Sequence, residues 1–289
     1  MKDKGRFFWI FGLIFLLVIT TLTLNKVFFS KKNPTFSPIL QGKVTSFISK
    51  KVWVSSPESD LPHRYALILE PKVSQKDLDS LPVLYILHGL PGSPEGMLGA
   101  MEKNLINSEI SRKKYFIAVF PDGSGRSFYD TEWQDAPKHS FMLESFITKN
   151  LISFVEGSHQ RDKRDRVIMG FSMGGYGASI IALHHPNLYT GVASIAGYYI
   201  VDDTSGVFSA TSARANITPS NFLPAAKKLR WFLAESSEES EPLILGQLDF
   251  WSNKLSSVGV TPFKSRLPGG HSNQFLSDEV SELVRWLNW

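Results

Sequence analysis

The sequence predicts an α/β protein with a mostly parallel central sheet and helices on both faces. Short continuous apolar runs, such as residues 81–87 and 115–120, are typical of strands buried on both faces of a parallel sheet. Longer stretches of helical character, such as residues 95–113, separate these runs. This alternation is typical of repeated βα units, so we expect one large domain of this class.

The order of elements follows from the same patterns. Residues 43–55 and 64–70 show strand-like apolar enrichment around the turn-rich residues 56–60, which predicts an opening antiparallel hairpin. The later elements alternate, with helices predicted at 140–156, 174–184, 242–258 and 277–288, strands at 166–170, 191–195, 229–234 and 261–267, and loops over the site at 196–223. No internal repeat is visible.

The N-terminus differs from this globular pattern. Residues 7–24 carry no charge and follow Lys2, Lys4 and Arg6. An 18-residue helix of this segment spans roughly 27 Å, which is close to the hydrocarbon thickness of a bilayer. A cleaved signal peptide is the main alternative, but the apolar run is long for one and no A-x-A site follows it. The third possibility for residues 7–24 is a helix buried in the core of the protein.

These features predict three parts of the chain: residues 1–29 as a membrane anchor or signal segment, 30–41 as a proline-bearing linker, and 42–289 as the catalytic domain. We expect a single-pass protein held in the membrane through residues 7–24 with its catalytic domain outside the cytoplasm. Cleavage of the N-terminus would make it a secreted protein.

Composition excludes several kinds of site. The net charge of +4 is modest and its basic residues are scattered, which does not favour a nucleic-acid partner. The chain has no cysteine, so disulfides, thiolate metal sites and a cysteine nucleophile are excluded. We expect neither a cofactor nor a metal, and composition leaves the oligomeric state open.

The motif with the clearest chemistry is G-x-S-x-G at residues 170–174, centred on Ser172. A bare match occurs by chance in about one chain of this length in ten, so its context decides. Here an apolar strand precedes the motif and a small-residue helix follows Gly174. That setting predicts the nucleophile elbow of an α/β-hydrolase fold, with a glycine-rich structural turn as the alternative.

A serine nucleophile needs a base, and in this fold the histidine follows the last strand. His271 lies there, after the flexible residues 268–270. The remaining histidines are better explained as surface or capping residues, except one in the 88–92 loop, which we interpret as structural; they are His63, His139, His159, His184, His185 and His88.

The third triad member should lie between the serine and the histidine, after a strand. The loop after the strand at 229–234 carries four glutamates, and an aspartate follows in the next predicted helix; the candidates are Glu235, Glu238, Glu239, Glu241 and Asp249. Residue type and spacing do not choose among them.

Two backbone N–H groups should stabilise the oxyanion. Met173 follows the nucleophile at the start of a helix and is the first predicted donor. The second should come from residues 88–92, where Pro91 has no N–H. Leu90 is therefore the predicted donor, and Gly89 permits close backbone approach.

With these residues in place, the chain resembles the esterase family that includes esterase D (S-formylglutathione hydrolase), feruloyl and acetylxylan esterases, siderophore esterases and the mycolyltransferases. The resemblance covers roughly residues 45–289. It rests on five motifs, at residues 84–89 (LYILHG), 119–123 (VFPDG), 169–178 (MGFSMGGYGA), 185–186 (HP) and 267–272 (LPGGHS).

The resemblance implies a serine carboxylesterase. Family members place the triad acid before a P-L pair, which here implies Glu241 from residues 240–243, with Glu238 as the alternative. An acyltransferase of the mycolyltransferase type and a non-catalytic binding protein are the other hypotheses. The predicted anchor favours an envelope or nutrient ester over cytosolic S-formylglutathione. Four aromatic residues border the predicted pocket, more as packing residues than as ligands: Tyr129, Trp133, Tyr198 and Tyr199.

Overall fold

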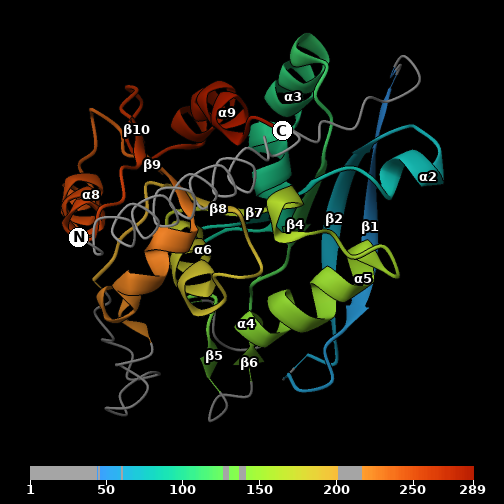
Figure 1. Ribbon diagram of the computed structural model, residues 1–289, viewed down its shortest axis with the longest axis horizontal. Helices are drawn as coiled ribbons and strands as arrows, with labels where there is room; N and C mark the ends of the chain where they lie inside the picture. The colour runs from blue at the N-terminus through green and yellow to red at the C-terminus, as the bar shows by residue number, and fades with distance from the viewer. Residues whose placement is uncertain (1–43, 45, 60, 126–129, 137–140, 201–216) are drawn as a thin grey trace, which may run out of the picture. The chain divides into compact units, whose positions relative to one another are not determined.

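A central sheet of eight strands organises the part of the chain that the computed structural model describes, namely residues 44, 46–59, 61–125, 130–136, 141–200 and 217–289. The strands run in the spatial order β1-β2-β4-β3-β7-β8-β9-β10 (Figure 1). Their bounds are β1 Phe47–Ser55, β2 His63–Pro71, β3 Val83–Leu87, β4 Ile117–Pro121, β7 Arg166–Phe171, β8 Gly191–Ile195, β9 Arg230–Ala234 and β10 Phe263–Ser265.

Strand directions agree with the sequence prediction. β1 and β2 form the expected antiparallel hairpin, and β2 is also antiparallel to β4. From β4 to β10 every pairing is parallel. Parallel strands share one carboxyl edge, so the loops after β3, β7, β9 and β10 lie at the same end of the sheet, where sites of α/β proteins form.

Helices cover both faces of the sheet (Figure 1). α3 (Pro94–Arg112) packs beside α9 (Asn273–Leu287) on one face, while α4 (Leu143–Ser145), α5 (Ile152–Glu156), α6 (Met173–His184) and α8 (Gln247–Ser257) belong to the other. A hydrophobic core lies on each face of the sheet, and successive side chains of β3 point into opposite cores. Tyr85 packs on the α6 side, whereas Leu84 and Ile86 pack on the α3 side. This explains why the strand is a continuous apolar run.

Smaller elements complete the fold. They are α2 (Gln75–Leu78), the two-stranded sheet β5 (Asp135–Ala136) with β6 (Phe141–Met142), and the short helices η2 (Phe146–Leu151), η3 (Lys163–Asp165) and η4 (Pro219–Lys228). The predicted helix at 140–156 begins at Leu143 and contains a π-helical turn. The 3₁₀ helix η4 was not predicted, because Pro224 and its polar neighbours give no helical period.

The terminal helix begins earlier than the sequence predicted. Ser272 has an extended backbone and its Oγ accepts the Phe275 amide at 3.2 Å, which is an N-cap. α9 therefore starts at Asn273, two residues after His271. The N-cap thus joins the predicted base to a rigid element.

The predicted anchor and linker, residues 1–41, lie outside the described residues. Within the described ranges, no helix combines the length and apolar character needed to cross a membrane.

Candidate active site

Ser172 lies on a sharp turn between β7 and α6. Its backbone has φ 57° and ψ −121°, an unusual conformation for a residue with a side chain. The neighbouring chain is very close: a Cβ added at Gly170 would lie 2.1 Å from the Gly174 carbonyl oxygen, and one added at Gly174 would lie 2.1 Å from the Leu87 carbonyl oxygen. Only glycine fits at either position, as the motif requires.

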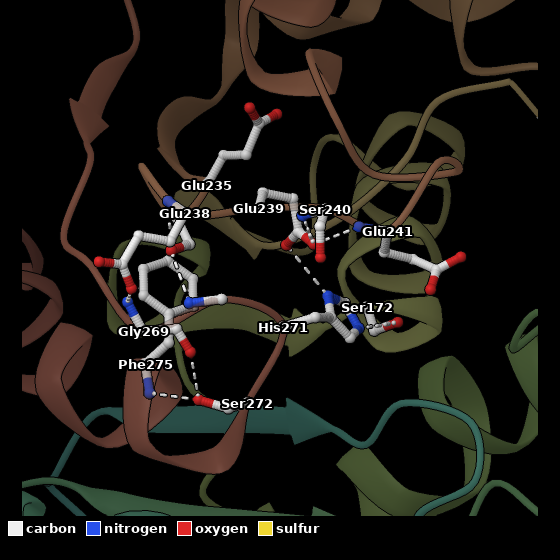
Figure 2. A network of polar contacts seen from close by, with 12 residues as sticks. Ser172, Glu235, Glu238, Glu239, Ser240, Glu241, Gly269, His271, Ser272 and Phe275 are labelled. Atoms are coloured by element: carbon white, nitrogen blue, oxygen red, sulfur yellow. Dashed lines mark hydrogen bonds and ion pairs between the residues drawn. The ribbon is translucent and has the colours of Figure 1, made fainter.

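His271 meets Ser172 across the carboxyl edge of the sheet. Its Nε2 lies 3.0 Å from Ser172 Oγ (Figure 2). The imidazole also packs on the Phe171 ring, with ring centroids 4.8 Å apart. The structure therefore brings the two predicted residues, 99 positions apart in the chain, within hydrogen-bonding distance.

The carboxylate that contacts His271 belongs to Glu239, and this corrects the choice of Glu241. Glu239 Oε2 lies 3.2 Å from His271 Nδ1 and its side chain is fully buried. Its Oε1 accepts the backbone N–H groups of Ser240 at 3.0 Å and of Glu241 at 2.9 Å. Glu241 is exposed, and its carboxylate points away from the imidazole (Figure 2). Its backbone, but not its side chain, contacts the Glu239 carboxylate.

The other candidate acids have different contacts. Glu238 Oε2 accepts the Gly269 N–H at 2.9 Å. Glu235 is buried and accepts the amides of Gly246 and Leu248, which start α8, and it also pairs with Arg266 at 3.2 Å. Asp249 pairs with the same arginine at 2.6 Å on the surface. Each of the three supports the fold around the histidine rather than the histidine itself.

The two predicted oxyanion donors lie close to Ser172. Met173 is the first residue of α6, so its N–H has no carbonyl partner one turn earlier within the helix. Leu90 lines two cavities that also contain Ser172. Their role as donors to a bound oxyanion stays a prediction.

His88 is a buried structural residue, as its loop position predicted. Its Nε2 accepts the Gly123 N–H at 3.0 Å, and its Nδ1 lies 2.9 Å from the Gly89 carbonyl oxygen, so Nδ1 carries the proton. Burial lowers the pKa of the imidazole. Trp133 donates its indole N–H to the His88 carbonyl at 3.0 Å and packs in the space left by Gly177. These contacts hold the 88–92 loop in place.

Most of the histidines and aromatic residues to which the sequence assigned no catalytic role make structural contacts. His184 and His185 both contact Glu144 at the end of α6, and His159 pairs with Asp79 at 3.3 Å. His63 begins β2. Tyr199 stacks on Trp251 and Tyr198 on Tyr176, which supports packing roles. His139 and Tyr129 lie outside the described residues.

Two cavities meet at Ser172 and His271. A cavity of about 330 Å³ is lined by residues 88–93, by Ser172 and His271, and by the start of α9. A cavity of about 510 Å³ is lined by Met173, Tyr198, Leu243 and Ile244, together with the acidic Asp130, Glu132 and Glu241. Ser172, His271 and Leu90 border both cavities, so the serine has open space on two sides.

Sequence reasoning missed two contributors to this site. Phe171 occupies a position of the G-x-S-x-G motif that accepts any residue, yet it packs on the imidazole. Ser236 was not considered, although its Oγ accepts the Gly270 N–H at 2.9 Å. Neither contact has a sequence signal, because both join segments far apart in the chain.

Comparison with known proteins gives a family match and several partial relatives. A family model described as "Esterase: Putative esterase" matches residues 59–252, well over half of the chain. The S-formylglutathione hydrolase of Bos taurus is 27% identical over 150 residues, covering 46% of this chain and 51% of the relative. The acetyl esterase of Caldicellulosiruptor saccharolyticus is 30% identical over 141 residues, covering 47% and 49%. The matched part thus spans about half the length of these relatives.

Solved structures share the fold over most of the chain. A ferulic acid esterase superposes with a TM-score of 0.72 at 17% identity, covering 84% of this chain and 98% of that one. An S-formylglutathione hydrolase from Agrobacterium tumefaciens gives a TM-score of 0.70 at 15% identity, covering 84% and 95%. At such identity these likenesses show the α/β-hydrolase-like fold alone. The family match over residues 59–252 shows that the chain belongs to this esterase family.

Proposed function

We propose that the protein is a serine carboxylesterase in which Ser172 is the nucleophile, His271 the base and Glu239 the acid. One observation carries the proposal: the buried Glu239 carboxylate, the His271 imidazole and the Ser172 hydroxyl form a continuous series of contacts at 3.2 and 3.0 Å. A carboxylate can only accept, so Nδ1 holds a proton toward Glu239 and Nε2 is left to accept the serine proton.

Acylation uses these groups in order. Ser172 Oγ attacks the ester carbonyl carbon while His271 Nε2 takes the hydroxyl proton. The Glu239 carboxylate stabilises the resulting imidazolium through Nδ1. The N–H groups of Leu90 and Met173 stabilise the oxyanion of the tetrahedral intermediate. Its collapse returns the proton to the leaving alcohol and leaves an acyl-enzyme on Ser172.

Deacylation repeats the sequence with a second nucleophile. Water loses a proton to His271 Nε2 as it attacks the acyl carbonyl carbon. Collapse of the second tetrahedral intermediate breaks the bond to Ser172 Oγ, which takes the proton back from His271, and the carboxylic acid is released. An acceptor alcohol in place of water would give acyl transfer, which is the second use of the same intermediate. The two cavities that border Ser172 suit an ester with a group on each side of the scissile bond.

We infer the location from residues 7–24 alone: an uncharged segment long enough to span a bilayer supports a membrane-held enzyme acting on esters outside the cytoplasm. Fractionation of cells expressing the full chain tests this. Recovery of the protein with membranes after a carbonate wash is expected. Recovery of a shortened chain in the medium would instead support the cleaved signal.

Labelling with a fluorophosphonate tests the nucleophile. The wild type should be labelled and should hydrolyse p-nitrophenyl acetate, whereas Ser172→Ala should lose the label and about 10³-fold or more of kcat. Ser257→Ala is the matched control, because that hydroxyl contacts only the Lys254 carbonyl on the surface of α8. An unlabelled wild type, or full labelling of Ser172→Ala, would contradict the proposal and favour a non-catalytic binding protein.

The balance between hydrolysis and transfer is measured separately. Acceptor alcohols of increasing size are added, and the ratio of new ester to free acid is followed. We expect hydrolysis to dominate, and a ratio that rises strongly with one class of alcohol would assign the enzyme to acyl transfer.

A further inference from the structure

The turn that carries His271 consists of glycines in unusual conformations. Gly269 has φ 124° and Gly270 has φ 61°, both in the region that favours glycine. Glycine has the largest backbone freedom of any residue, so this turn has little intrinsic stiffness. The position of the imidazole must therefore be set by contacts from outside the turn.

Two side chains from the loop after β9 supply such contacts. Ser236 is only 2% exposed, and its Oγ accepts the Gly270 N–H at 2.9 Å and the Glu238 N–H at 3.1 Å. Glu238 Oε2 accepts the Gly269 N–H at 2.9 Å (Figure 2). Both glycine amides next to the base are thus bonded to the loop that also carries Glu239.

On the other side, the turn is tied to α9. Ser272 Oγ donates to the Gly269 carbonyl oxygen at 2.7 Å and accepts the Phe275 N–H at 3.2 Å. The helix cap sets the far end of the turn, and the bonds from Ser236 and Glu238 set its approach to Glu239. Loss of the bonds from Ser236 and Glu238 would leave the helix anchor and the backbone bond from the Ser237 N–H to the Leu267 carbonyl oxygen, but would free both glycine amides next to His271.

We propose that Ser236 is a positioning residue that aligns His271 with Glu239 and Ser172, and that Glu238 assists it more weakly from the surface. This inference rests on the proposed esterase function. The hydroxyl of Ser236 extends the contact between residues 235–241 and the glycine turn at residues 268–270 up to Gly270, the residue next to His271, beyond the backbone bond from Ser237 to Leu267. The Glu239 carboxylate and the imidazole are thereby held in one orientation. A displacement of about 1 Å in a catalytic group can cost 10²-fold in rate, which sets the scale of the effect.

The test compares Ser236→Ala with Ser237→Ala, whose side chain lies next in the chain but is exposed. Active sites are titrated with a fluorophosphonate, so that kcat refers to folded, reactive enzyme. Ser236→Ala is expected to lose roughly 10- to 100-fold in kcat per titrated site with KM changed by less than about twofold. Its kcat/KM profile should also move its acidic limb to lower pH, because a misaligned imidazolium is less stabilised by Glu239.

A second pair of variants keeps the test decisive if Ser236→Ala does not fold. Glu238 is exposed, so its replacement should not endanger folding. Glu238→Ala should lose about 3- to 10-fold in kcat per titrated site, and Glu238→Gln, which retains an acceptor for Gly269, should recover most of it.

The outcomes separate this proposal from the proposed function. If the wild type hydrolyses esters but Ser236→Ala equals Ser237→Ala per titrated site, with an unchanged pH profile, the positioning role is wrong and the esterase function stands. For an unfolded Ser236→Ala, equal rates of Glu238→Ala and Glu238→Gln would overturn it. If the wild type is neither labelled nor active, both proposals fail together.

Discussion

The turn at Ser172 and the loop at residues 235–241 lie at the same edge of the sheet but are held in different ways. Around Ser172, steric contact determines which residues fit: the glycines two residues before and two after it have no room for a Cβ. In residues 235–241, no such constraint exists, and four glutamates share a short polar loop. Hydrogen bonds to distant segments give Glu235, Glu238 and Glu239 their separate roles.

The difference shows which kind of site a sequence motif can describe. A steric requirement within a few residues leaves a pattern of glycines, and that pattern can be read directly. The choice of one carboxylate among several is different. It depends on the position of an imidazole 32 residues away in the chain, and it therefore leaves no pattern in the sequence. The following variants test this contrast, beginning with the largest expected effect.

Gly174→Ala should abolish folding or destabilise the protein by more than about 4 kcal/mol, because its Cβ would lie 2.1 Å from the Leu87 carbonyl oxygen. Urea unfolding measures the loss. Gly99→Ala is the control: Gly99 is exposed within α3, an added Cβ meets nothing within 4 Å, and a gain of up to about 1 kcal/mol is expected. Equal stability of Gly174→Ala and wild type would refute the steric account of the turn.

Glu239→Gln should lower kcat by roughly 10²- to 10⁴-fold, because an amide no longer stabilises the imidazolium that forms at His271. Glu241→Gln, two residues away and exposed, should stay within about twofold of wild type. Steady-state hydrolysis of p-nitrophenyl acetate measures both. A reversed order of the two variants would restore Glu241 as the acid.

Glu235→Ala should destabilise the fold by about 2–4 kcal/mol, because it leaves the amides of Gly246 and Leu248 without their acceptor and Arg266 without its buried partner. Asp249→Ala removes the exposed partner of the same arginine and should cost less than about 1 kcal/mol. Chemical denaturation compares the two. Similar losses of unfolding free energy in the two variants would mean that the buried Glu235 stabilises the fold no more than the exposed Asp249 does.

The smallest effect concerns Glu279, which lies beneath β10 and accepts the Ser265 hydroxyl at 2.8 Å. Burial raises the pKa of this carboxyl to about 7. The native state therefore favours the protonated form, and the stability it contributes below the unfolded pKa is lost as pH rises through about 7.

Glu279→Gln imitates the protonated form and removes this dependence. Between about pH 5 and pH 8, the Tm of the wild type should fall relative to that of the variant by on the order of 5 °C. Thermal unfolding at both pH values measures it. If the Tm difference between wild type and Glu279→Gln does not change with pH, the Glu279 carboxyl does not titrate in this range.

Most of the fold was predictable from local pattern. The antiparallel hairpin of β1 and β2, the parallel strands from β3 to β10 and the main helices lie close to the expected ranges, since buried parallel strands leave continuous apolar runs. The early start of α9 and the helix η4 departed from expectation. The start of α9 depends on the Ser272 cap, and η4 contains Pro224. Neither feature produces a periodic pattern of apolar residues in the sequence.

By itself, the sequence determined the fold class and identified Ser172 and His271 as the candidate nucleophile and base, because each depends on residues close together in the chain: the glycines around Ser172, the strand before them and the glycine turn before His271. Only the tertiary structure decided that Glu239 faces His271, that Glu241 faces solvent, and that Ser236 and Glu238 bond to the glycine turn. Those choices depend on the distance between two loops at the sheet edge, and the order of residues within either loop does not encode that distance.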